Sequence, residues 1–272
     1  MTQDQPQDHI SKKRVLYTLP GMNDVTIRRQ IEYRRSGGSA LTLDVYTPPD
    51  ADNRAPLPAV VFVIGFPDPG ARRILGCTAN EMASYISWAQ LVAASGLAAI
   101  TYVNEEPSDV HAVFDYLRQH ATSLGIDAGR LGVWSCSGSG PMGLSVLMQE
   151  GPHPPKCGAL VYPYTLDLDG SGGTAAAAKQ WGFANACSAK SVHDFARDRP
   201  LLVARAGQDQ MPALNETLDR FVAAALGRNL PITLVNHASG PHAFDLFDDS
   251  ETTRDVVRQV LEFFRFQLQR AS

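Results

Sequence analysis

Cysteine is scarce in this chain, and the few residues present form no metal-binding or redox pattern. The four cysteines are spread along the sequence without a C-x-x-C pair or paired His/Cys spacing: Cys77, Cys136, Cys157 and Cys187. Closely spaced cysteine and histidine ligands usually indicate structural zinc, and dense cysteines indicate a disulfide framework. We therefore expect reduced thiols, a cytoplasmic location, and neither a metal nor a cofactor.

Strong charge and long apolar runs are also lacking. The formal net charge is −4 over 272 residues, which gives no basic surface for nucleic acid or an anionic membrane. No apolar run reaches the roughly 20 residues that a membrane-spanning helix needs. The polar segment 1–20 is expected to be poorly ordered, and residues 1–14 lack the apolar core of a signal peptide. A small molecule is the expected partner, and the oligomeric state stays open.

From residue 58 onward, continuous apolar runs alternate with segments of helical apolar spacing. The continuous runs indicate strands buried on both faces of a parallel sheet, and they cover 58–64, 98–103, 131–134, 158–162, 201–206 and 232–236. The segments with helical spacing are 82–95, 110–121, 140–149, 213–226 and 251–268.

Two earlier segments, 25–34 and 41–47, alternate with period two around a Ser-Gly-Gly-Ser turn. They predict an antiparallel hairpin at a sheet edge. Together with the alternation that follows, they predict one doubly wound α/β domain over 21–272 with a mostly parallel sheet.

The stretch 163–200 breaks this rhythm and is rich in Gly, Ala and Asp. It is either a long loop with one helix or a small lid inserted over a site. Trp181 and Phe183 within it, and Met211 beyond it, are either pocket walls or core residues.

A strand that ends at a run of small residues marks the candidate nucleophile. The apolar run 131–134 stops at Ser135-Cys136-Ser137-Gly138-Ser139. A nucleophile elbow, usually G-x-S-x-G, holds its reactive side chain at a strained apex and needs small residues two positions to either side. Only Ser137 has two small flanks, because Cys136 at the apex would place a tryptophan there. We therefore predict Ser137 as the nucleophile and Cys136 as a packed thiol.

A serine nucleophile needs an imidazole to take its proton and a carboxylate to orient that imidazole. In elbow-type folds the acid and then the histidine follow the serine along the chain. Asp209 stands just after the strand 201–206, and His242 follows 232–236 in a Gly-Pro turn. His237 comes directly off that strand and competes as the base, although it is more typical of a residue that satisfies backbone groups. The rival acids are more typical of turns or caps: Asp167, Asp169 and Asp245.

Two backbone amides are expected to bind the oxyanion, those of Gly138 and of Phe66 in the loop after 58–64. With these residues in order, the chain resembles the α/β-hydrolase-fold proteins near the dienelactone-hydrolase-like and small acyl-esterase branches. The resemblance covers about residue 25 to the C-terminus and implies a Ser-Asp-His mechanism without metal or cofactor. This chain departs from it by serine in both glycine places of the elbow. Dienelactone hydrolases proper carry a cysteine nucleophile, so that activity does not carry over.

These features predict a serine hydrolase that cleaves a small-molecule carboxylic ester through an acyl-enzyme. Two alternatives remain open. The same triad could cleave an amide or peptide bond, or the chain could be a non-catalytic relative that acts as a binding protein.

Overall fold

The computed structural model describes residues 9–51, 55–151 and 153–269 of the chain, and residues 1–8 of the predicted N-terminal segment lie outside this description. The strands are β1 Thr26–Ser36, β2 Ser39–Thr47, β3 Leu57–Phe62, β4 Ala98–Tyr102, β5 Ile126–Cys136, β6 Cys157–Val161, β7 Leu201–Ala206 and β8 Ile232–His237. In the described residues they form one eight-stranded sheet in the order β1-β2-β4-β3-β5-β6-β7-β8. This confirms the predicted fold class.

The sheet is parallel from β4 through β8, and β2 joins β4 and β1 in antiparallel pairs. Every residue of β3, β4 and β6 is buried, which explains why these strands read as continuous rather than alternating apolar runs. β5 is longer than predicted, because its first half, 126–130, is mostly half-buried and polar and so escapes a search for apolar runs.

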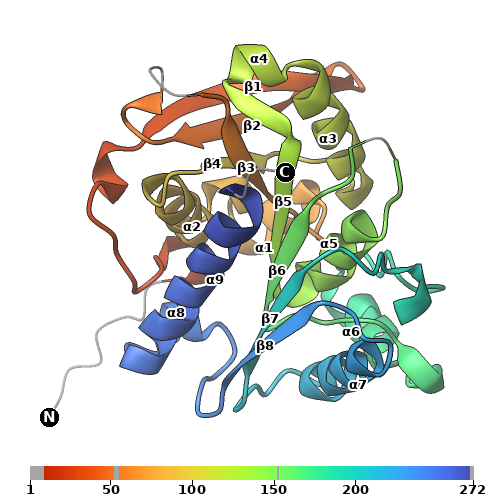
Figure 1. Cartoon of the computed structure of the whole chain (residues 1–272). Helices are drawn as coiled ribbons and strands as arrows, with labels where there is room; N and C mark the ends of the chain where they lie inside the picture. The colour runs from red at the N-terminus through yellow and green to blue at the C-terminus, as the bar shows by residue number, and fades with distance from the viewer. Residues whose placement is uncertain (1–8, 52–54, 152, 270–272) are drawn as a thin grey trace, which may run out of the picture.

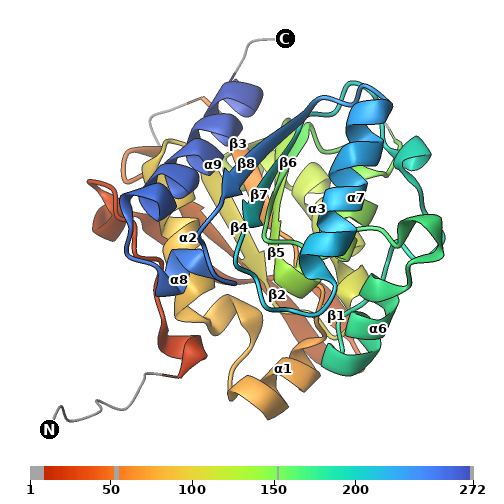
Figure 2. The same cartoon turned by 90° about the horizontal axis from the view of Figure 1, so that it is seen from below.

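Helices cover both faces of the sheet. The α-helices are α1 Asp68–Leu75, α2 Ala83–Ala94, α3 Val110–Gln119, α4 Ala121–Leu124, α5 Gly140–Leu147, α6 Gly173–Trp181, α7 Leu214–Gly227, α8 Phe244–Phe247 and α9 Glu251–Gln269. Short 3-10 helices are η1 Ile10–Lys12, η2 Met22–Asp24, η4 Ala79–Glu81, η5 Pro107–Asp109, η6 Ser137–Ser139, η7 Leu168–Gly170 and η8 Val192–Asp194. Helices α2 and α9 lie on one face, and α3, α5 and α7 lie on the other (Figures 1 and 2).

No helix within the described ranges is long and apolar enough to cross a bilayer.

Helix α1 was not predicted from the sequence. It contains Pro69 in its first turn, where a missing N–H costs nothing, and it ends at Gly76 in a left-handed conformation. Proline and glycine lower the helical signal of such a short segment, which explains why its sequence looks like a loop.

Residues 9–20 are attached to the body of the protein, contrary to the expectation of poor order. Val15 is buried and its N–H donates to Ser87 Oγ at 3.0 Å. The next amide, that of Leu16, donates to the Asp245 carbonyl oxygen at 2.9 Å. Backbone hydrogen bonds such as these leave no mark in composition, so a polar segment can still be fixed.

Candidate active site

Ser137 occupies a strained turn between β5 and α5. Its φ is +51°, in the left-handed region that residues other than glycine seldom adopt. The carbonyl of Ser137 accepts hydrogen bonds from the N–H groups of Gly140 and of Tyr164, the latter at 3.0 Å. Such surrounding bonds hold the strained conformation in place. The local geometry is that of a nucleophile elbow with Ser137 at its apex.

The two serines that replace the usual glycines of the elbow have different surroundings. Ser135 is fully buried, and its hydroxyl has no hydrogen-bond partner among the described residues. It packs so closely on Gly143 of α5 that a Cβ at that glycine would clash with the hydroxyl. Ser139 is also buried, but its Oγ accepts a hydrogen bond from the Gly65 N–H at 2.9 Å.

Ser137, His242 and Asp209 lie in one hydrogen-bonded line. Ser137 Oγ is 3.0 Å from His242 Nε2, and His242 Nδ1 is 2.7 Å from Asp209 Oδ2. The Asp209 side chain is fully buried, whereas that of His242 is 26% exposed. With its proton on Nδ1, the imidazole donates to the carboxylate and its Nε2 accepts from the serine hydroxyl.

Parallel strands bring these three residues to the same edge of the sheet. Ser137 follows β5, Asp209 follows β7, and His242 follows β8, whose last residue pairs with the last residue of β7. Open α/β sheets place their sites at this edge.

The loops after β7 and β8 are joined to each other, which fixes the acid and the histidine together. The Gly207 N–H donates to the His237 carbonyl at 2.8 Å, and the Gln208 N–H donates to the Gly240 carbonyl at 2.9 Å. A third bond, from the Met211 N–H to Asp209 Oδ1 at 2.8 Å, fixes the second carboxylate oxygen. Asp209 therefore presents one defined oxygen to His242.

His237 and one of the rival acids, Asp167, are used elsewhere. His237 is buried, and its Nε2 lies 2.8 Å from Asp248 Oδ2 and 3.0 Å from Thr253 Oγ1, so it links β8 to the start of α9 through side chains. Asp167 accepts the first amides of α6, those of Thr174 and Ala175, both at 2.7 Å. Within the described residues, neither His237 nor Asp167 forms a hydrogen bond to Ser137 or His242.

Tyr162 is a site residue that the sequence did not point to. Its φ is +40°, and its ring packs edge-on against His242 with centroids 5.0 Å apart. The Tyr162 hydroxyl donates to Asp245 Oδ1 at 2.7 Å, and Trp88 Nε1–H donates to Asp245 Oδ2 at 2.7 Å. Burial raises the pKa of the Asp245 carboxyl, while these two bonds favour its charged form. Asp245 thus supports the wall behind the histidine.

The predicted oxyanion residues lie against each other. A Cβ on Gly65 would stand 2.6 Å from the Gly138 carbonyl oxygen, so only glycine allows this approach. Gly138 is in the first turn of η6, where N–H groups have no acceptor within the helix. The Phe66 N–H makes no hydrogen bond to any residue that the structure describes. The Phe66 amide is thus left without an acceptor among the described residues, and its loop packs on Gly138, the residue that follows Ser137.

Aromatic rings cover the elbow on the side of Gly138. A Cβ on Gly138 would lie 2.6 Å from the Phe183 ring and 2.8 Å from the Phe66 ring. The two rings contact each other edge-on at a centroid distance of 5.8 Å, and Phe183 also packs on Tyr164 at 5.2 Å. Phe183 is buried within this aromatic cluster, whereas Trp181 is 45% exposed.

Cys136 precedes the apex and points toward Tyr85, with its Sγ 3.9 Å from the hydroxyl oxygen. Burial raises the pKa of this thiol to about 12. The thiolate, which is the reactive form, is therefore scarce at neutral pH.

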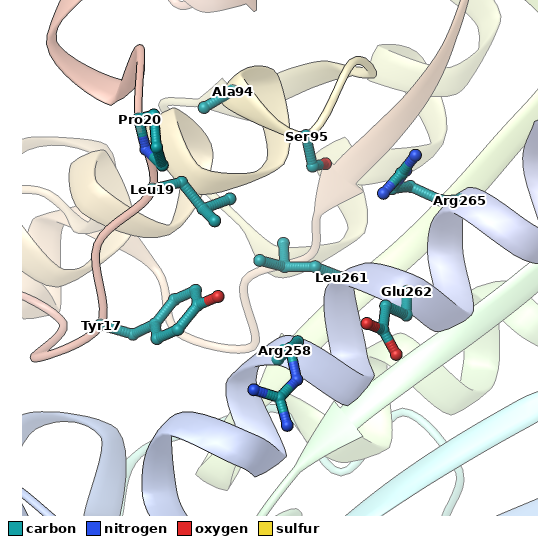
Figure 3. A pocket seen from close by; sticks show the side chains of 9 residues that line it. All are labelled: Tyr17, Leu19, Pro20, Ala94, Ser95, Arg258, Leu261, Glu262 and Arg265. Atoms are coloured by element: carbon teal, nitrogen blue, oxygen red, sulfur yellow. The ribbon is translucent and has the colours of Figure 1, made fainter. Parts of the chain in front are cut away.

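No cluster of three or more His, Cys, Asp or Glu side chains that could hold a metal ion occurs within residues 9–51, 55–151 and 153–269. A hollow of about 350 Å³ lies between the N-terminal segment, α2 and α9, lined among others by Tyr17 and Arg258 (Figure 3). Another of about 480 Å³ adjoins His193 and Arg228. Neither is lined by Ser137, His242 or Asp209.

No family model matches the chain, and no curated protein matches it in sequence. Solved structures do match. A bacterial heroin esterase is 17% identical with a TM-score of 0.69, over 94% of this chain and 88% of that one.

A thermophilic esterase from the Planctomycetes species Thermogutta terrifontis is 18% identical with a TM-score of 0.63, over 90% of this chain and 93% of that one. An α/β-hydrolase enzyme from a Medee basin deep-sea metagenome library is 19% identical with a TM-score of 0.60, over 90% of this chain and 99% of that one. The sheet, its antiparallel hairpin and the covering helices are those of the α/β-hydrolase fold.

Proposed function

We propose that this protein is a serine hydrolase that cleaves small-molecule carboxylic esters, close to the small acyl-esterase and dienelactone-hydrolase-like branches of the fold. One observation carries the proposal: the hydrogen-bonded line from Ser137 through His242 to the buried Asp209. A strained serine at a strand-to-helix turn, beside two backbone amides, is the arrangement that acyl transfer requires. The neighbours described as esterases support the choice of an ester bond.

In the first half-reaction, Ser137 Oγ attacks the ester carbonyl carbon while its proton passes to His242 Nε2. The carbonyl oxygen becomes an oxyanion, which the N–H groups of Gly138 and Phe66 bind. The imidazolium is stabilised by Asp209, and it gives the proton to the leaving alcohol oxygen as the carbon–oxygen bond breaks. The product of this half-reaction is an acyl-enzyme on Ser137.

In the second half-reaction, water takes the place of the alcohol. His242 Nε2 accepts a proton from the water, whose oxygen adds to the acyl carbon. The second tetrahedral intermediate uses the same two amides. Ser137 Oγ then leaves and recovers the proton from the imidazolium, which releases the carboxylic acid.

We include in the proposal that residues 21–272 act as one domain and that 163–200 is an insertion that covers the site. Support for this comes from Phe183, whose ring lies over Gly138, and from the adjacent Ala184 N–H, which donates to the Gly65 carbonyl at 2.8 Å. The insertion would thereby form the acyl side of the pocket.

Hydrolysis of p-nitrophenyl acetate and labelling by a fluorophosphonate probe test the proposal together. The wild-type protein is expected to do both, and Ser137→Ala is expected to do neither. Labelling with turnover of p-nitroanilides but not of p-nitrophenyl esters would favour an amide hydrolase. A folded wild-type protein that neither labels nor hydrolyses would be a non-catalytic relative.

A further inference from the structure

We propose that Ser139 is a positioning residue that ties the loop bearing the Phe66 amide to the elbow and so completes the oxyanion hole. The inference rests on the proposed function, and it gives a role to a serine that stands where the elbow usually has glycine.

The four consecutive backbone amides that follow β3, those of residues 63–66, differ in their hydrogen-bond acceptors. The Val63 N–H donates to the Trp134 carbonyl at 2.8 Å. The Ile64 N–H donates to the Tyr102 hydroxyl at 3.2 Å, and the Gly65 N–H donates to Ser139 Oγ at 2.9 Å. Only the fourth of them, that of Phe66, has no partner among the described residues. After the last backbone bond, the amides of Ile64 and Gly65 therefore donate to side-chain oxygens, and the next amide, that of Phe66, is left without a partner within the described ranges.

The planarity of the peptide bond fixes the direction in which the Phe66 amide points. The Gly65 carbonyl and the Phe66 N–H belong to one trans peptide and point in opposite directions. That carbonyl accepts the Ala184 N–H at 2.8 Å, so the Phe66 N–H is directed away from Ala184. The Phe66 carbonyl is held in turn by Asn104 Nδ2 at 3.2 Å, and Asn104 is itself buried.

Ser139 supplies the remaining constraint, which is the distance between the two oxyanion donors. Its backbone directly follows Gly138, the residue with the other donor, so a bond from Ser139 to Gly65 ties the loop to the elbow at that donor. The contact is close, because a Cβ on Gly65 would lie 2.8 Å from the Ser139 Cα. With glycine at 139 the Gly65 N–H would lose its acceptor. Among the described residues, no other hydrogen bond from the elbow would then fix the distance between this loop and Gly138.

The test removes the side-chain hydroxyl at each of the two positions that flank Ser137, one at a time. Ser139→Ala removes the acceptor of the Gly65 N–H, and Ser135→Ala removes a hydroxyl without a partner. The substrate is p-nitrophenyl acetate, and phenylboronic acid serves as a tetrahedral, anionic mimic of the intermediate. Ser139→Ala is expected to lower kcat by about 10- to 100-fold with KM changed less than about threefold, because misplacing a donor weakens transition-state binding more than substrate binding.

Inhibition by phenylboronic acid should weaken in Ser139→Ala by a similar factor, which a purely structural role would not produce. Ser135→Ala should match the wild type in kcat, KM and boronate affinity. Ser139→Thr keeps a hydroxyl and, if it folds, should have a higher kcat than Ser139→Ala. If Ser139→Thr does not fold, Ser139→Gly takes its place in the test, and its kcat should be as low as that of Ser139→Ala.

Three results would overturn the inference. The first is a kcat of Ser139→Ala within twofold of the wild type, and the second is an equal loss in Ser135→Ala. The third is a rise in KM without a fall in kcat. If one of these results is found and the wild-type protein still labels with the fluorophosphonate, only the inference about Ser139 is overturned and the proposed function stands. Wild-type protein that fails to label would remove both.

Discussion

Replacing Asp209 by asparagine is the substitution whose effect the structure defines most closely. The side chain is fully buried, and its two oxygens have separate partners: Oδ1 accepts the Met211 N–H and Oδ2 faces His242 Nδ1. An asparagine has only one oxygen. If that oxygen faces the Met211 amide, the NH₂ group faces the imidazole. The opposite rotamer would set two donors, the NH₂ group and the Met211 N–H, against each other 2.8 Å apart.

The favoured rotamer of Asp209→Asn therefore imposes the wrong tautomer on His242. Nδ1 must accept from the NH₂ group, so the ring proton moves to Nε2, which can no longer accept the proton of Ser137. The expected loss in kcat is on the order of 10⁴-fold, or about 5 kcal/mol in activation free energy. The fold should be retained, because asparagine has nearly the same shape.

The assay is steady-state hydrolysis of p-nitrophenyl acetate, with circular dichroism to verify folding. Asp219→Asn is the matched control, since this carboxylate forms an exposed pair with Arg205 on β7. It is expected to leave kcat unchanged. A folded Asp209→Asn variant within tenfold of the wild-type kcat would refute the assigned role of the acid.

Three further predictions concern the base, the thiol and the aromatic wall. His242→Ala should abolish turnover without unfolding the protein, whereas His237→Ala should lower Tm but retain kcat; the reverse pattern in kcat would contradict the choice of base. Cys136 should react with iodoacetamide far more slowly than a free cysteine at pH 8, and Cys136→Ala should keep most activity, because a pKa raised from 9.0 to about 12 lowers the thiolate fraction on the order of 10³-fold. This protection should weaken as pH rises toward that pKa, and inactivation that tracks alkylation of Cys136 at pH 8 would count against it. Phe183→Val should raise the ratio of kcat/KM for p-nitrophenyl hexanoate over acetate, by about 10-fold for the space opened beside Gly138; an unchanged ratio would mean that the acyl chain lies elsewhere.

The sequence predicted the parts of the fold whose physical cause is local. Strand β7 was predicted with the bounds that the structure has, because a mostly apolar run of six residues between polar loops is short for a helix and of typical length for a buried strand. The same reasoning placed Asp209 and His242 after neighbouring strands, and parallel strands bring such residues to one edge. The hydrogen bonds between these residues join segments that are distant in sequence, so they could be seen only in the structure.

What the sequence missed depends on contacts between distant residues. The position of Tyr162 behind His242 depends on Asp245, which accepts hydrogen bonds from Tyr162 and Trp88. Asp245 is 83 residues from Tyr162 and 157 residues from Trp88 along the chain. No local pattern marks such a network. The two serines of the elbow look equivalent in sequence, yet one accepts a hydrogen bond from Gly65 and the other has no partner. The difference arises from the loop that packs on one side alone.

The most direct test of the proposed function is to identify the residue that a serine-directed reagent modifies. Intact-mass measurement after phenylmethylsulfonyl fluoride, followed by peptide mapping, locates the adduct. We predict one adduct per chain, on Ser137, and none in Ser137→Ala. A stoichiometric adduct on Cys136 or Ser139, or no adduct on the folded wild-type protein, would contradict it.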